Sequence, residues 1–114
     1  METHGTADET TPYAGDMKDT WYGPYYGTET VIEDWAKWHQ LDDYELTKIS
    51  KCARGYNIDL HRYSSASDGT DVRLYELFGA PHDWPKNLGD KTTSSVIWDF
   101  FKSHLAESGA EFLN

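Results

Sequence analysis

Apolar side chains recur at helical spacing in two parts of the chain, and the first part covers residues 29–41. Thr30 and Glu33 in this part have the spacing of a capping box, in which two side chains satisfy backbone N–H groups at the start of a helix. The periodic apolar positions predict a helix with one face packed on the rest of the domain. That face comprises Val31, Ile32, Trp35, Ala36 and Trp38.

The second helical pattern covers residues 93–106. Gly109 follows it, and glycine is a common signal for the end of a helix. The pattern again predicts one apolar face. Its members are Val96, Ile97, Phe100, Phe101 and Leu105.

Between the helices, residues 56–63 and 72–78 alternate in the manner of strands, with side chains directed to two faces. Residues 64–70 between them have turn chemistry, so the two strands are expected to form an antiparallel hairpin over about 56–78. Residues 46–49 are compatible with a further short strand. Two helices that pack on a sheet give the fold class α/β.

Two loops carry the residues most suited to chemistry, one at about residues 4–15 and one at 79–87. The first contains Asp8 and the second contains His82, which follows a strand and precedes a helix. Loops at strand ends on a rigid scaffold are common places for catalytic groups. Taken separately, each loop also fits an ordinary turn, because aspartate is frequent in turns for backbone reasons.

Composition narrows the classes of partner. The formal net charge of −10 over 114 residues would repel a phosphate backbone, so no nucleic-acid partner is expected. The length suits one domain, and no apolar run is long enough to span a bilayer. The first residues lack the basic and apolar regions of a secretion signal. Cys52 is the only cysteine, so no internal disulfide forms. Cysteine usage therefore does not decide between a reducing and an oxidising cell compartment.

Four short motifs, in this order, resemble the C-terminal part of the polyhydroxybutyrate depolymerase and feruloyl esterase family of α/β-hydrolases. Residues 4–13 match His-Gly-Thr-x-Asp-x-x-x-Pro-Tyr, and a helix with Trp-Ala follows at 35–36. Residues 79–85 match Gly-x-x-His-x-Trp-Pro, and residues 97–101 match Ile-Trp-x-Phe-Phe. The resemblance covers residues 3–104.

The resemblance implies that residues 1–114 are a single partial α/β-hydrolase domain with an incomplete sheet. Asp8 would be the acid of a catalytic triad and His82 its base, in the usual order of serine, acid and histidine. The implied reaction is hydrolysis of carboxylic esters, polymeric or small: polyhydroxyalkanoate, feruloyl or acetyl polysaccharide esters. It needs no cofactor and no metal, and the family is secreted. Trp84, Tyr13 and Trp21 would contact substrate.

If the family plan holds, Asp8 and His82 lie in loops at the same end of adjacent strands. The Asp8 carboxylate then accepts a hydrogen bond from one imidazole nitrogen at about 2.6–3.2 Å. Asp83 is the rival acid, but adjacent side chains on an extended segment diverge.

Part of the family pattern has no counterpart here. No serine lies in a Gly-x-Ser-x-Gly segment, and the apolar strand before His4 is reduced to residues 1–3. We therefore expect residues 1–114 to be the C-terminal piece of a longer esterase. Their expected partner is the N-terminal part of the same domain, and residues 1–114 alone are expected to show no turnover. The alternative is a non-catalytic, aromatic-rich binding or interaction domain derived from the same fold.

Three weaker candidates remain. Metal binding by His61 with Asp59, or by His39 with the acids at 42–43, matches no strong ligand spacing, so no metal is predicted. Cys52 is more typical of inert packing than of a nucleophile. The aromatic cluster at 21–26 fits stacking on sugar or phenolic rings and fits a cover over the core equally well.

Overall fold

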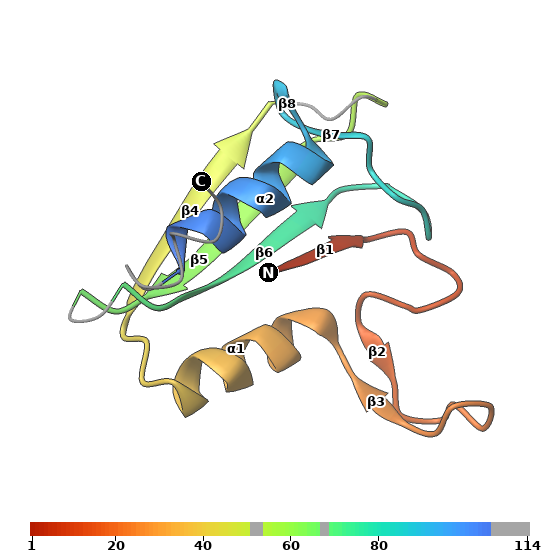
Figure 1. The fold of residues 1–114 in the computed structure, drawn as a ribbon. Helices are drawn as coiled ribbons and strands as arrows, with labels where there is room; N and C mark the ends of the chain where they lie inside the picture. The colour runs from red at the N-terminus through yellow and green to blue at the C-terminus, as the bar shows by residue number, and fades with distance from the viewer. Residues whose placement is uncertain (51–53, 67–68, 106–114) are drawn as a thin grey trace.

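The structure is a computed structural model that describes residues 1–50, 54–66 and 69–105 (Figure 1). Its centre is a four-stranded sheet in the order β1-β6-β5-β4. The strands are β1 (Glu2–Gly5), β4 (Asp43–Ile49), β5 (Ile58–Ser64) and β6 (Asp71–Leu77). Cys52 and Gly109 lie outside the described residues.

The sheet is mixed. β6 pairs antiparallel with β5, from Ile58 opposite Leu77 to Ser64 opposite Asp71, which confirms the predicted hairpin. β4 adds antiparallel to β5 and contains the short strand that the sequence allowed. β1 instead runs parallel to β6. Two small pairs complete the strands: β2 (Gly15–Asp16) with β3 (Tyr25–Tyr26), and β7 (Asn87–Leu88) with β8 (Lys91–Thr92).

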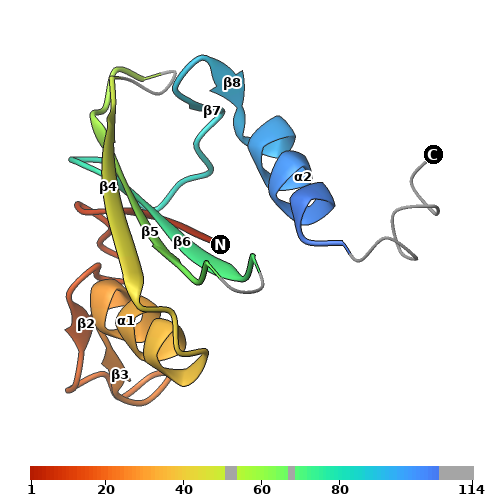
Figure 2. The ribbon, with the colours of Figure 1, turned by 90° about the vertical axis from the view of Figure 1, so that its left-hand side faces the viewer.

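The two helices, α1 (Thr28–Trp38) and α2 (Thr93–Ser103), lie on opposite sides of the sheet (Figure 2). Side chains of β6 alternate between them. Leu74 borders a hollow with Ile32 of α1, whereas Tyr75 and Leu77 pack with Val96 of α2. The predicted mixed α/β arrangement, with helices packed on a sheet, is therefore present.

The face that α1 buries differs from the predicted one. Ile32 and Ala36 are buried, but Val31, Trp35 and Trp38 are 40%, 55% and 80% exposed. The buried stripe consists of Thr28, Ile32 and Ala36. It lies one position along the helix from the stripe of Val31 and Trp35. Its side chains are smaller than tryptophan, and small side chains allow a helix to pack closer to its neighbour.

The start of α1 also differs from the predicted start. The helix begins at Thr28 after Gly27, whose position has no side-chain cap. Thr30 is thus already inside the helix, and the predicted capping box with Glu33 is wrong. The backbone N–H of Thr28 instead donates to the carbonyl of Tyr13 at 2.8 Å, so the preceding loop positions the helix.

In α2 the prediction is closer. The Thr92 hydroxyl accepts a hydrogen bond from the backbone N–H of Ser95 at 3.2 Å and caps the helix. Val96 and Phe100 of the predicted apolar face are half-buried. Phe101 and Leu105 are exposed, contrary to the prediction. Phe100 contacts Arg73 of β6, and the next side chain along a helix points about 100° away from it.

β1 sets the geometry of the two loops. The predicted loop at 4–15 contains the end of this strand, and the loop proper begins at Thr6. Since β1 and β6 are parallel neighbours, the loops that follow them begin at the same end of the two strands. The N–H of Thr6 donates to the carbonyl of Leu77, and the N–H of Ala7 donates to the carbonyl of Ala80, both at 3.0 Å. The Thr6 hydroxyl accepts from the N–H of Gly79 at 2.8 Å.

Gly5 is required by this close contact. A Cβ atom at position 5 would lie 2.1 Å from the carbonyl oxygen of Ala80, which belongs to the backbone and cannot rotate away. We predict that Gly5→Ala lowers the free energy of unfolding by about 2 kcal/mol, as overpacking does. Urea denaturation measures the loss. Thr3→Ala, in the same strand, is the control and should cost less than about 1 kcal/mol; equal losses would contradict the steric explanation.

Candidate functional site: a buried carboxylate and a histidine

Asp8 sits in the first turn after β1, and its position is fixed by the local backbone. Its Oδ1 accepts hydrogen bonds from the backbone N–H groups of Thr10 at 2.9 Å and Thr11 at 2.7 Å. Aspartate stabilises such turns by bonding to N–H groups two and three residues later. The carboxylate is buried, with 6% of the side chain exposed.

The second carboxylate oxygen of Asp8 is directed at His82. Nδ1 of His82 donates to Oδ2 of Asp8 at 2.8 Å, across 74 positions of sequence. This contact confirms the predicted geometry. Asp83, the rival acid, pairs with Arg54 at 2.8 Å and accepts from the backbone N–H of Trp84. The pair is therefore formed by Asp8 and His82.

The environment of Asp8 favours its ionised form. Burial acts against the charge, but hydrogen bonds from the Thr11 backbone, His82 and the Thr10 backbone outweigh burial and hold the pKa below its usual value. At neutral pH the group is a carboxylate. A carboxylate beside Nδ1 keeps the proton on that nitrogen, which leaves the lone pair of the imidazole on Nε2.

His4 supports the acid from the other side, a role that the sequence analysis missed. Nε2–H of His4 donates to the carbonyl of Thr11 at 2.8 Å and lies 3.4 Å from Oδ2 of Asp8. The Thr28 hydroxyl lies 3.2 Å from Nδ1 of His4. His4 therefore joins the acid loop to the start of α1. Its place at the head of the first motif was the only signal in the sequence.

His82 borders an open hollow of about 490 Å³. Its side chain is 57% exposed, and among the residues that the structure describes none hydrogen-bonds Nε2. The described residues that line the hollow include no serine. They are Glu2, Thr3, His4, Gly5, Asp8, Thr11, Pro81, His82, Asp83 and Trp84. All four residues of β1 thus border the hollow beside His82.

Of the three predicted substrate contacts, the structure brings only Trp84 to this hollow. Trp21 is 84% exposed in the turn between β2 and β3. Tyr13 packs edge-on against His4, with ring centroids 5.6 Å apart, and its hydroxyl is buried. Neither Trp21 nor Tyr13 lines the hollow, so substrate contact by these two residues stays a prediction.

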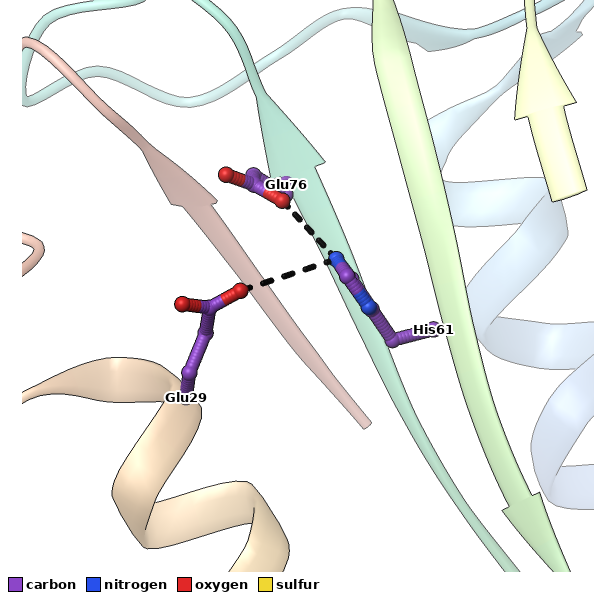
Figure 3. Close-up of side chains that lie close together, drawn as sticks. All are labelled: Glu29, His61 and Glu76. Atoms are coloured by element: carbon purple, nitrogen blue, oxygen red, sulfur yellow. Dashed lines mark hydrogen bonds and ion pairs between the residues drawn. The ribbon is translucent and has the colours of Figure 1, made fainter. Parts of the chain in front are cut away.

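A second polar cluster lies on the α1 side of the sheet, where His61 of β5 meets Glu76 of β6 and Glu29 of α1 (Figure 3). Asp59, which the sequence analysis considered beside His61 as a possible metal ligand, contacts Lys48 at 3.2 Å. Asp59 is only two residues from His61 along the chain. The glutamates that actually contact His61 belong to two other elements, α1 and β6. Sequence spacing therefore gave no signal for this cluster.

His39, which the sequence analysis considered and set aside as a metal ligand, stacks on Trp35 at 5.8 Å. Within the described parts of the chain, Glu29, His61 and Glu76 form the only group of three potential ligand residues whose atoms converge. His39 and the acids at 42–43 form no such group.

The fold and the site together define an α/β domain with a buried carboxylate–histidine pair at the ends of two parallel strands. No protein-family model, curated protein or solved structure matches the chain. None of the helices in the described residues is long and apolar enough to cross a membrane.

Proposed function

We propose that residues 1–114 are the C-terminal part of a serine carboxylic-ester hydrolase of the polyhydroxybutyrate depolymerase and feruloyl esterase type. Asp8 is the orienting acid and His82 the general base, and the nucleophilic serine comes from polypeptide outside these residues. The observation that carries the proposal is the 2.8 Å hydrogen bond between Asp8 and His82. Nothing local in the sequence brings these residues together.

Each group has a defined role in the proposed reaction. Asp8 holds the proton of His82 on Nδ1, so that Nε2 accepts the serine proton during attack on the ester carbonyl. The carboxylate then stabilises the imidazolium, which returns the proton to the leaving alcohol. In the second half, Nε2 takes a proton from water, and the resulting attack releases the acid and regenerates the serine.

Among the described residues no strand pairs with the outer edge of β1, which supports a serine supplied by polypeptide outside residues 1–114. β1 is a terminal strand of the sheet, and its residues line the hollow beside His82. A segment that adds to this edge would enter the space next to Nε2. We propose that the serine-bearing segment pairs there. Trp84, which is 58% exposed at the same hollow, is then placed to contact the ester substrate.

The isolated chain is predicted to show no turnover of p-nitrophenyl acetate beyond the rate of free imidazole at the same concentration. The reason is that the base has no serine to activate among the described residues around it. A spectrophotometric assay with purified residues 1–114 measures the rate. Turnover that His82→Ala abolishes would contradict this division of roles.

The coding sequence upstream of Met1 gives an independent test. The proposal predicts an in-frame Gly-x-Ser-x-Gly segment there, or in a separately encoded chain that copurifies with this one. A native preparation that hydrolyses no ester and contains no such segment would contradict the proposal.

A second candidate function is an aromatic-rich binding or interaction domain without chemistry. The observation that favours it is the exposure of large aromatic side chains, with Trp21 and Tyr22 both 84% exposed and Trp38 80% exposed. Ring stacking on sugars or phenolic groups uses such surfaces. Binding of a feruloylated oligosaccharide that quenches tryptophan fluorescence, is unchanged by His82→Ala and leads to no hydrolysis would favour this candidate.

A further inference from the structure

The cluster of Glu29, His61 and Glu76 gathers three ligand-type side chains from three elements on the α1 side of the sheet (Figure 3). Nε2 of His61 lies 2.8 Å from Oε1 of Glu76 and 4.0 Å from Oε1 of Glu29. One ligand atom from each residue falls within 4.8 Å of the other two. A single small ion can bridge groups at this separation.

The cluster carries more negative charge than its histidine can neutralise. Glu33 also borders the adjoining hollow of about 90 Å³, whose lining contains no lysine or arginine among the described residues. Glu76 is buried, at 9% exposed, and a buried carboxylate is costly without a positively charged partner.

A second observation points to a ligand in the same place. The Tyr13 hydroxyl is buried close to the carboxylates of Glu29 and Glu76, in poor hydrogen-bonding geometry with both. A hydroxyl has one proton, so it can donate to only one of the two carboxylates at a time. A cation between the carboxylates would supply the other one with a partner.

We propose that Glu29, His61 and Glu76 bind a divalent cation of the zinc type. Zn²⁺ accepts imidazole nitrogen and carboxylate oxygen together, and three protein ligands with water in the remaining position are a common set. Mg²⁺ strongly prefers an all-oxygen set, so the histidine discriminates against it. This site does not depend on the proposed esterase function.

Tyr44 gives the histidine the orientation that a metal ligand needs. Its hydroxyl lies 2.8 Å from Nδ1 of His61. When Nδ1–H donates to this oxygen, the lone pair of Nε2 faces the two glutamates. Metal-binding histidines are generally held by such a contact at the second nitrogen.

The role of the cation is to fasten α1 to the sheet. Glu29 is in the first turn of α1, whereas the other two ligands are on the central strands β5 and β6. The same turn of α1 is joined through Thr28 to His4, beside the acid loop. An ion that binds only the folded chain stabilises it by mass action.

The test is a titration of the chelator-treated full chain with Zn²⁺ by isothermal calorimetry, followed by thermal unfolding with and without the ion. All proteins carry Cys52→Ser, so that a thiol does not compete. We expect one Zn²⁺ per chain, a higher Tm with Zn²⁺, and binding of Mg²⁺ at least ten-fold weaker.

The variants locate the site. His61→Gln and Glu29→Gln should each weaken Zn²⁺ binding at least ten-fold, and His39→Gln, on the outer surface of α1, should leave it unchanged. Glu29 is 53% exposed, so its variant keeps the test valid if His61→Gln disturbs the fold. Absence of Zn²⁺ binding, binding that survives Glu29→Gln, or an equal loss in His39→Gln would overturn the proposal. The first result would leave His61 in its hydrogen bond with Glu76 and no ion.

Discussion

His82→Ala is expected to lower kcat/KM for a p-nitrophenyl ester by about 10³–10⁴-fold in the joined polypeptide, which combines residues 1–114 with the serine-bearing segment. Without the imidazole, nothing next to the hollow takes the serine proton. Asp8→Asn should cost a similar factor, because an amide no longer fixes the proton on Nδ1 of His82. Steady-state kinetics of the purified variants measure both effects.

The two losses should not add. The acid acts only through the histidine, so the double variant Asp8→Asn/His82→Ala is expected to be no slower than His82→Ala alone. His39→Ala, which changes an outer-surface histidine that stacks on Trp35, is the control and should retain activity within about two-fold. Additive losses in the double variant would show that Asp8 acts elsewhere.

The second large effect concerns stability. Asp8→Ala is expected to lower the free energy of unfolding by about 3 kcal/mol at pH 7, because the N–H groups of Thr10 and Thr11 and Nδ1 of His82 lose their acceptor in a buried place. Asp16→Ala is the matched control. Asp16 accepts from the N–H of Lys18 in a similar but exposed turn, and its loss should cost about 0.5 kcal/mol.

The effect of Asp8→Ala should depend on pH in one direction. The pKa of Asp8 is lowered by folding, so its ionisation contributes stability above the pKa of the unfolded chain, at about 3.9. This contribution to the free energy of unfolding is lost as the pH falls through the pKa of Asp8 in the folded protein. Urea denaturation should therefore show a smaller difference in the free energy of unfolding between Asp8→Ala and wild type below pH 4 than at pH 7. A gap that widens in acid would contradict the cause given for the pKa.

The sequence predicted those features that depend on local pattern or on an ordered set of motifs. Alternation gave the hairpin of β5 and β6, and the motif order correctly placed Asp8 against His82. The residue pattern alone did not predict β1, because its four residues have no apolar alternation and owe their strand form to the parallel partner β6. Only the family resemblance implied a strand before the acid loop. Pairing with a distant segment leaves no signal in so short a stretch.

The helix faces and the second polar cluster show a different limit. In α1 two neighbouring apolar stripes have helical spacing, and side-chain size decides which one fits against the sheet. Periodicity does not contain this information. Glu29, His61 and Glu76 converge because α1 lies on the side of the sheet to which His61 and Glu76 point, and no spacing along the chain encodes this packing.

The most direct test of the proposed function is covalent labelling of the joined polypeptide with a fluorophosphonate, with the labelled residue identified by mass spectrometry. The account predicts label on the serine of a Gly-x-Ser-x-Gly segment, at a rate that His82→Ala reduces about 10³-fold or more. Absence of label from the wild-type polypeptide, or a labelling rate unchanged by His82→Ala, would contradict the assignment of Asp8 and His82 as an esterase acid and base.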